Sequence, residues 1–154
     1  MPSDATNEMT KQEWRELGFF YDCDDQTRVW TLTGSRAGLL RFRDALLSYV
    51  ADPRRAQKSE HEHYGPYMYL VVTTWPEAGI DGHSIFGPLA DLARLAKLIE
   101  AKLAMAQPGS SFIIREEFAA DSAYALAFDL QEEGFDPATA DTLLPVEDAP
   151  HRDV

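Results

Sequence analysis

Short apolar stretches, each bounded by turn residues, recur along the chain and predict β-strands. The longest is YMYLVVTTW at 67–75, whose near-continuous apolarity is typical of a central strand. At 124–130, large apolar residues alternate with alanines and Asp129, as expected of a strand with one face in the core. The other predicted strands lie at 19–21, 28–33, 83–86 and 112–118.

Two segments carry apolar residues at spacings of three and four, which predicts amphipathic helices. The first spans roughly 35–50, and Ser35 is its natural N-cap. The second opens at Gly87-Pro88, with proline at the first helical position, and ends before Gln107-Pro108-Gly109. Residues 1–12 are polar and aperiodic, so we expect them to be disordered, with at most one helical turn following at 13–18.

The predicted strand–helix units repeat at an offset of 53 residues. Gly34 falls on Gly87 and Leu39 on Leu92, at matching points of the two units. The pattern predicts an α+β fold in the order ββα-ββα-ββ, with one mostly antiparallel sheet and both helices packed on one face. A ferredoxin-like arrangement with added edge strands is one version of this fold. We expect a single α+β domain over 13–133, preceded by a disordered N-terminus at 1–12 and followed by an acidic flexible tail at 134–154.

Composition places the chain among globular proteins. Its 154 residues are 45% hydrophobic, and no apolar run approaches the ~20 residues that span a bilayer, so no membrane association is expected. Cys23 is the only cysteine, which excludes an intrachain disulfide. The first residues lack the basic and apolar regions of a secretory signal. The sequence therefore predicts a cytoplasmic protein.

The net charge of −12 is concentrated at the two ends of the chain. Residues 1–25 carry a net charge of −5 and residues 129–154 carry −7, whereas the stretch between them is neutral. Such a field repels phosphate, so nucleic acid is not an expected partner. It would attract a basic protein partner.

Three histidines are the candidate metal ligands. On an extended segment, His61 and His63 would point to the same side. Zinc would need a third ligand, which His83 or Asp81 could supply from the strand predicted to pair with 67–75. The alternative is a solvated polar loop without a cofactor.

Two further motifs are explained by turns. The carboxylates beside Cys23 should raise the pKa of its thiol, which is the wrong direction for a nucleophile. The stretch Gly34-Ser35-Arg36-Ala37-Gly38 resembles a phosphate loop but lacks the lysine of that motif, and the repeat explains it as a strand-to-helix turn.

The strongly negative ends, the lone cysteine and the strand–glycine–helix units TLTGS (31–35) and SIFGP (84–88) resemble the small acidic immunity proteins of bacterial polymorphic toxin systems. The resemblance covers residues 19–130 in organisation only and implies a non-enzymatic inhibitor that docks an acidic surface on a basic toxin domain. The expected contact residues are Asp22, Asp24, Asp25, Glu116 and Glu117, with the aromatic residues Tyr64, Tyr67 and Tyr69.

Two other functions stay open at this point. One is a metal-dependent or small-ligand enzyme that uses His61, His63 and His83. The other is a self-associating protein whose open sheet face forms a homodimer.

Overall fold

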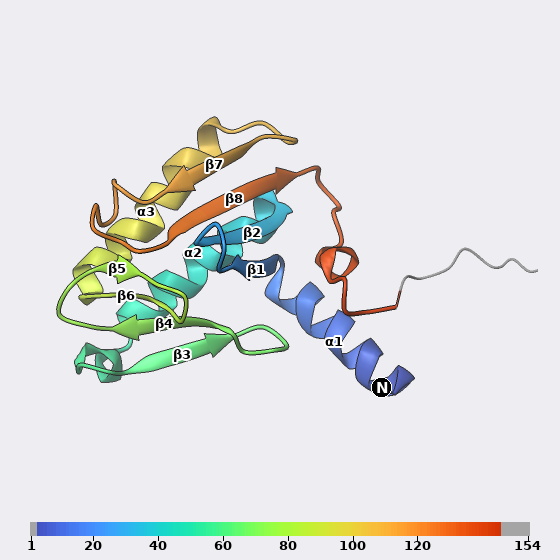
Figure 1. The fold of residues 1–154 in the computed structure, drawn as a ribbon, viewed down its shortest axis with the longest axis horizontal. Coiled ribbons are helices and arrows are strands. Elements are labelled where there is room, and N and C mark those ends of the chain that lie inside the picture. Colours follow the sequence, from blue (N-terminus) through green and yellow to red (C-terminus); the bar gives the residue numbers. More distant parts are fainter. Residues whose placement is uncertain (1–2, 146–154) are drawn as a thin grey trace, which may run out of the picture.

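Within residues 3–145, the part of the chain that the computed structural model describes, three α-helices and eight strands form an α+β fold (Figure 1). The helices are α1 (Asp4–Leu17), α2 (Arg36–Ala51) and α3 (Leu89–Met105), and two short 3-10 helices are η1 (Pro53–Ala56) and η2 (Pro137–Ala140). The strands are β1 (Phe20–Asp24), β2 (Val29–Ser35), β3 (His61–Tyr64), β4 (Leu70–Thr74), β5 (Gly79–Ile80), β6 (Ile85–Gly87), β7 (Ser111–Ile114) and β8 (Ala125–Gln131).

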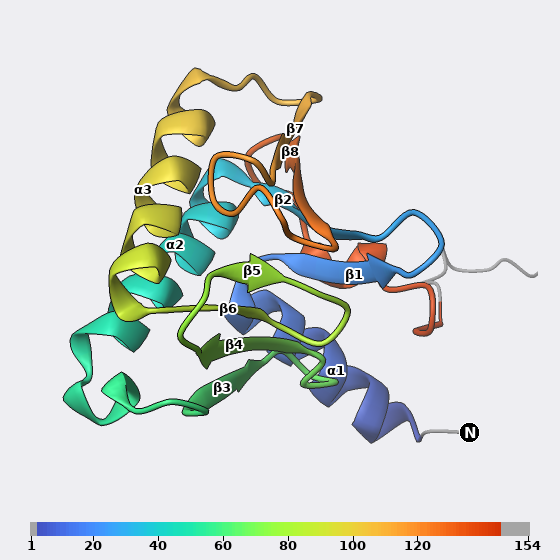
Figure 2. The same ribbon diagram turned by 60° about the vertical axis from the view of Figure 1, so that its left-hand side comes forward.

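The strands are divided between two four-stranded sheets of the same design. The first has the order β1-β2-β8-β7 and the second β3-β4-β6-β5. In each sheet the central pair is parallel, β2 with β8 and β4 with β6, and both outer pairs are antiparallel hairpins. The predicted α+β class is confirmed, and four of the six strand pairings among the described residues are antiparallel, but these strands form two mixed sheets where one sheet was expected. Helices α2 and α3 do pack together on one side of the sheets (Figure 2).

The internal repeat explains why there are two sheets. Each half of the chain contributes a hairpin, a helix and a second hairpin: β1-β2-α2-β3-β4, then β5-β6-α3-β7-β8. The second hairpin of each half pairs with the first hairpin of the other half. The offset of 53 holds at its anchor, because Gly34 lies near the end of β2 and Gly87 ends β6, each just before its helix.

Three segments that the sequence pattern assigns to loops or disorder are ordered. Helix α1 covers most of the segment expected to be disordered, and it is capped by the Ser3 hydroxyl and by Gly18 in the left-handed region. Strand β3 lies in the histidine segment, for which a solvated polar loop was the alternative, and β5 lies between the strands predicted at 67–75 and 83–86. Polar composition hid α1 and β3, because β3 is an edge strand and α1 buries only Lys11 and Trp14. Strand β5 has only two residues, too few for a sequence pattern.

The predicted flexible tail is also partly packed. Its segment η2 lies against α1, and Ala138, Asp141 and Leu144 are buried. A bidentate ion pair between Arg15 and Asp136 holds the two segments together. Residues 146–154 of that predicted tail lie outside the described residues.

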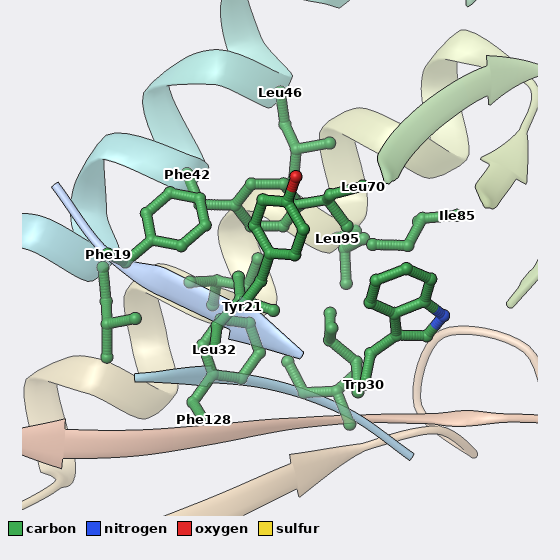
Figure 3. Close-up of a cluster of buried hydrophobic side chains, with 14 of the residues drawn as sticks. Phe19, Tyr21, Trp30, Leu32, Phe42, Leu46, Leu70, Ile85, Leu95 and Phe128 are labelled. Atoms are coloured by element: carbon green, nitrogen blue, oxygen red, sulfur yellow. The ribbon is translucent and has the colours of Figure 1, made fainter. Parts of the chain in front are cut away.

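One continuous core joins both sheets to the helices (Figure 3). Phe42 and Leu46 of α2 and Leu95 of α3 meet side chains such as Leu32 of the first sheet and Leu70 of the second. All five are fully buried. None of the helices within residues 3–145 combines the length and apolarity needed to cross a membrane.

Candidate binding cleft

A cleft of about 530 Å³ lies where the two sheets meet. One wall comes from β1 and the other from the loop at 65–69 that leads into β4, with the turn at 82–83 beside it. Trp14 of α1 and the segment 141–143 close one end. The cleft therefore draws on the beginning, the middle and the end of the described chain.

The floor of the cleft is aromatic. The Trp14 ring lies 4.8 Å from Phe20, 5.1 Å from Tyr21 and 5.9 Å from Tyr67, measured between ring centroids. Trp14 and Tyr21 are buried, and the Tyr21 hydroxyl donates to the Tyr64 carbonyl and accepts the Tyr69 amide at 3.1 Å. Because these polar atoms already have partners, the floor offers mainly ring surface to a ligand.

Large apolar side chains are exposed around the rim. Tyr69 is 68% exposed, Met68 55% and Leu143 77%. Met68 also has a φ of 60°, in the left-handed region that non-glycine residues seldom adopt. Exposed apolar groups gathered beside a concave surface mark a protein-interaction site more often than scattered ones do.

The β1 side of the cleft carries exposed carboxylates, those of Asp22 and Asp25. Asp25 Oδ1 accepts the Tyr124 hydroxyl at 2.7 Å and lies 3.6 Å from the Cys23 sulfur. Burial, followed by the charge of Asp25, raises the pKa of Cys23 to about 12. The predicted direction of this shift is confirmed, and the thiol stays protonated at neutral pH.

Hydrogen bonds to the Asp141 side chain anchor the C-terminal segment of the described chain beside the cleft. The buried Oδ2 of Asp141 accepts both the Trp14 indole at 2.8 Å and the Tyr67 hydroxyl at 2.7 Å, while Oδ1 accepts the Leu143 amide. Burial and the neighbouring carboxylate of Asp141 raise the pKa of Tyr67. Sequence reasoning missed Asp141 and Leu143, although an apolar Leu143-Leu144 pair within a polar tail is a signal for docking.

The predicted contact residues are only partly brought together. Asp22, Asp25, Tyr67 and Tyr69 line the cleft. Asp24 instead stabilises the β1–β2 turn, where it accepts the Gln26 amide at 2.9 Å.

The other predicted contact residues lie away from the cleft. Tyr64 is half-buried beside Arg55 and Glu62, and burial raises its pKa. Glu116 pairs with Arg115 and Glu117 with Lys102, both beyond β7.

The predicted metal triad is not assembled. His61 and His63 are adjacent, with ring centroids 5.1 Å apart, but His83 lines the cleft. Among residues 3–145, no three side chains of His, Cys, Asp or Glu form a group that could hold a metal ion.

No protein-family model matches the chain, and the searches of curated proteins and of solved structures likewise gave no match.

Proposed function

We propose that the protein is a non-enzymatic binding module that docks a basic segment of a partner protein in the cleft, and that it serves as a toxin-neutralising protein of the immunity type. The observation that carries the proposal is the union of an aromatic floor, an exposed apolar rim and two exposed carboxylates in one concave site.

Charge determines which partner suits the cleft. No lysine or arginine is among the described residues that line it. Asp22 and Asp25 take part in no salt bridge within residues 3–145, and only Oδ1 of Asp25 has a hydrogen-bond partner there, so a cation could pair with either carboxylate. An arginine or lysine side chain can lay its apolar stem on aromatic rings while its charged end reaches a carboxylate.

The carboxylates and the exposed apolar side chains of the cleft would contribute to partner binding in different ways. Surface carboxylates chiefly raise the rate of association with a basic partner, by an amount that falls with salt. Burial of Tyr69, Met68 and Leu143 under the partner would supply most of the affinity, because buried aromatic anchors dominate such interfaces. A partner held in this way would have its own basic functional surface blocked.

The test is to examine the neighbouring gene for a toxin-like domain and to co-express that domain with the protein. We expect the wild-type chain to restore growth and Tyr69→Ala to lose that protection. Asp22→Asn with Asp25→Asn should lower the association rate roughly tenfold at low salt. The matched control is Glu132→Gln with Glu133→Gln, which removes two exposed charges at the far end of β8. Absence of an adjacent toxin-like reading frame, or of any rescue, would contradict the proposal.

A further inference from the structure

His61 and His63 form an exposed pair on the outer edge of the second sheet. Both belong to β3, an edge strand, and face Thr73 and Val71 of β4 in register. Both side chains are exposed, their ring centroids are 5.1 Å apart and their planes are nearly perpendicular, at 85°. Residues two apart on a strand share a face, so the backbone itself holds the two rings together.

Hydrogen bonds set the tautomer of both rings. Nδ1 of His61 lies 3.0 Å from the Ser59 carbonyl oxygen, and Nδ1 of His63 lies 3.0 Å from the Met68 carbonyl oxygen. A carbonyl oxygen can only accept, so each Nδ1 carries a proton and donates it. In the neutral imidazole the lone pair is then on Nε2, and no hydrogen bond within residues 3–145 uses either Nε2 atom.

This is the arrangement that metal-ligating histidines adopt, with one ring nitrogen donating to a carbonyl and the other binding the ion. Two imidazoles on one tetrahedral metal, with nitrogen–metal distances of about 2.0–2.1 Å, have ring centres about 5 Å apart. The observed separation of 5.1 Å agrees with that geometry.

We propose that His61 and His63 chelate one divalent transition metal ion of the zinc, copper and nickel class through their two Nε2 atoms. The site differs from the histidine triad that the sequence pattern suggests, because His83 belongs to the cleft. Glu62 lies on the opposite face of β3, where it pairs with Arg55. Two protein ligands leave the remaining coordination positions to water, so the site is open and weaker than a structural zinc site.

The pair is joined to the cleft through one hydrogen bond. The Met68 carbonyl that accepts from His63 belongs to a residue whose side chain lines the cleft. The metal site does not depend on the proposed function, because it rests on β3 and its hydrogen bonds alone.

Isothermal titration of the whole chain with Cu²⁺, Ni²⁺ and Zn²⁺ tests the proposal, with Mg²⁺ as the oxygen-preferring comparison. We expect one ion per chain, tightest for Cu²⁺, and no heat with Mg²⁺. His61→Asn and His63→Asn each retain a donor near the Nδ1 position but remove Nε2. Either substitution should weaken metal binding at least about tenfold. Once one imidazole holds the ion, the second binds it intramolecularly, and each variant loses that gain in affinity.

His83→Asn is the matched control, since it removes an exposed histidine of the cleft and should leave binding unchanged. On metal addition, the NMR signals of the His61 and His63 ring protons should shift first. This result would distinguish binding at the pair from binding at His151, the remaining histidine of the chain. The proposal is wrong if no transition metal binds at millimolar concentration. It is equally wrong if His83→Asn weakens binding as much as the β3 variants, or if the β3 variants leave it unchanged. Circular dichroism checks that every variant is folded.

Discussion

The Trp14 indole donates a hydrogen bond of 2.8 Å to the Asp141 carboxylate, across 127 residues of sequence. The same oxygen accepts the Tyr67 hydroxyl, so one buried carboxylate ties the first helix, the central loop and the C-terminal segment of the described chain together. This link joins three of the segments that line the cleft.

Asp141→Ala should lower the free energy of unfolding by about 2–3 kcal/mol, because it leaves the buried Trp14 indole without its acceptor and deprives Tyr67 of its partner. Urea denaturation followed by tryptophan fluorescence measures the change. Thr142→Ala, at an exposed neighbouring position, should change stability by less than about 0.5 kcal/mol. Equal effects of the two substitutions would contradict the role given to Asp141.

Cys23 should react slowly with iodoacetamide at pH 8. The thiolate is the reactive form of cysteine. With a pKa of about 12, the thiolate fraction of Cys23 at pH 8 is lower than that of an ordinary cysteine by a factor of roughly a hundred or more. The rate should keep rising with pH towards 12. Asp25→Asn should speed the reaction at pH 8, because it removes the carboxylate that disfavours the thiolate; mass spectrometry of the alkylated protein gives both rates. A reaction as fast as that of a free cysteine peptide would disprove this account.

Gly38→Ala should destabilise the protein although alanine is the better helix former. A Cβ atom at position 38 would lie 2.0 Å from the Gly18 carbonyl oxygen, a backbone atom that cannot move aside cheaply. We expect a loss of about 2 kcal/mol or more, in the range typical of overpacking. Ser48→Ala, at an exposed position of the same helix, should be neutral or slightly stabilising, and thermal unfolding of both variants checks the contrast.

Arg36→Lys should weaken the junction between the two helices. The Arg36 guanidinium donates to the carbonyls of Leu103 and Ala106 at the C-terminal end of α3, and a lysine cannot reproduce that fork. A loss of about 1–2 kcal/mol is expected in chemical denaturation. Arg41→Lys is the control, since Arg41 is exposed and forms no salt bridge within residues 3–145. A similar loss in both variants would mean that the helix-end contacts contribute nothing specific.

Local signals in the sequence predicted local structure well. The apolar spacing and the Ser35 cap placed the first predicted helix within one residue of α2. The parallel pairing of β2 with β8 joins residues about a hundred positions apart, and no local pattern encodes it, so the division into two sheets could not be predicted.

The sequence also predicted only some of the residues that line the cleft. Asp22, Tyr67 and Tyr69 lie in segments whose charge or aromatic content was conspicuous, and all three line the cleft. Asp141 accepts the Trp14 indole across 127 residues, and no local sequence pattern encodes a contact between side chains so far apart.

Because the two halves of the chain exchange hairpins, the first sheet can form fully only after both halves have been synthesised. During synthesis, β2 stays an open sheet edge until residue 131 has emerged, because its second partner is β8. Neither half can close both of its hairpins into a finished sheet without the other. Completion of the sheets therefore depends on pairings between residues far apart in the sequence, which form slowly because a long loop must close first.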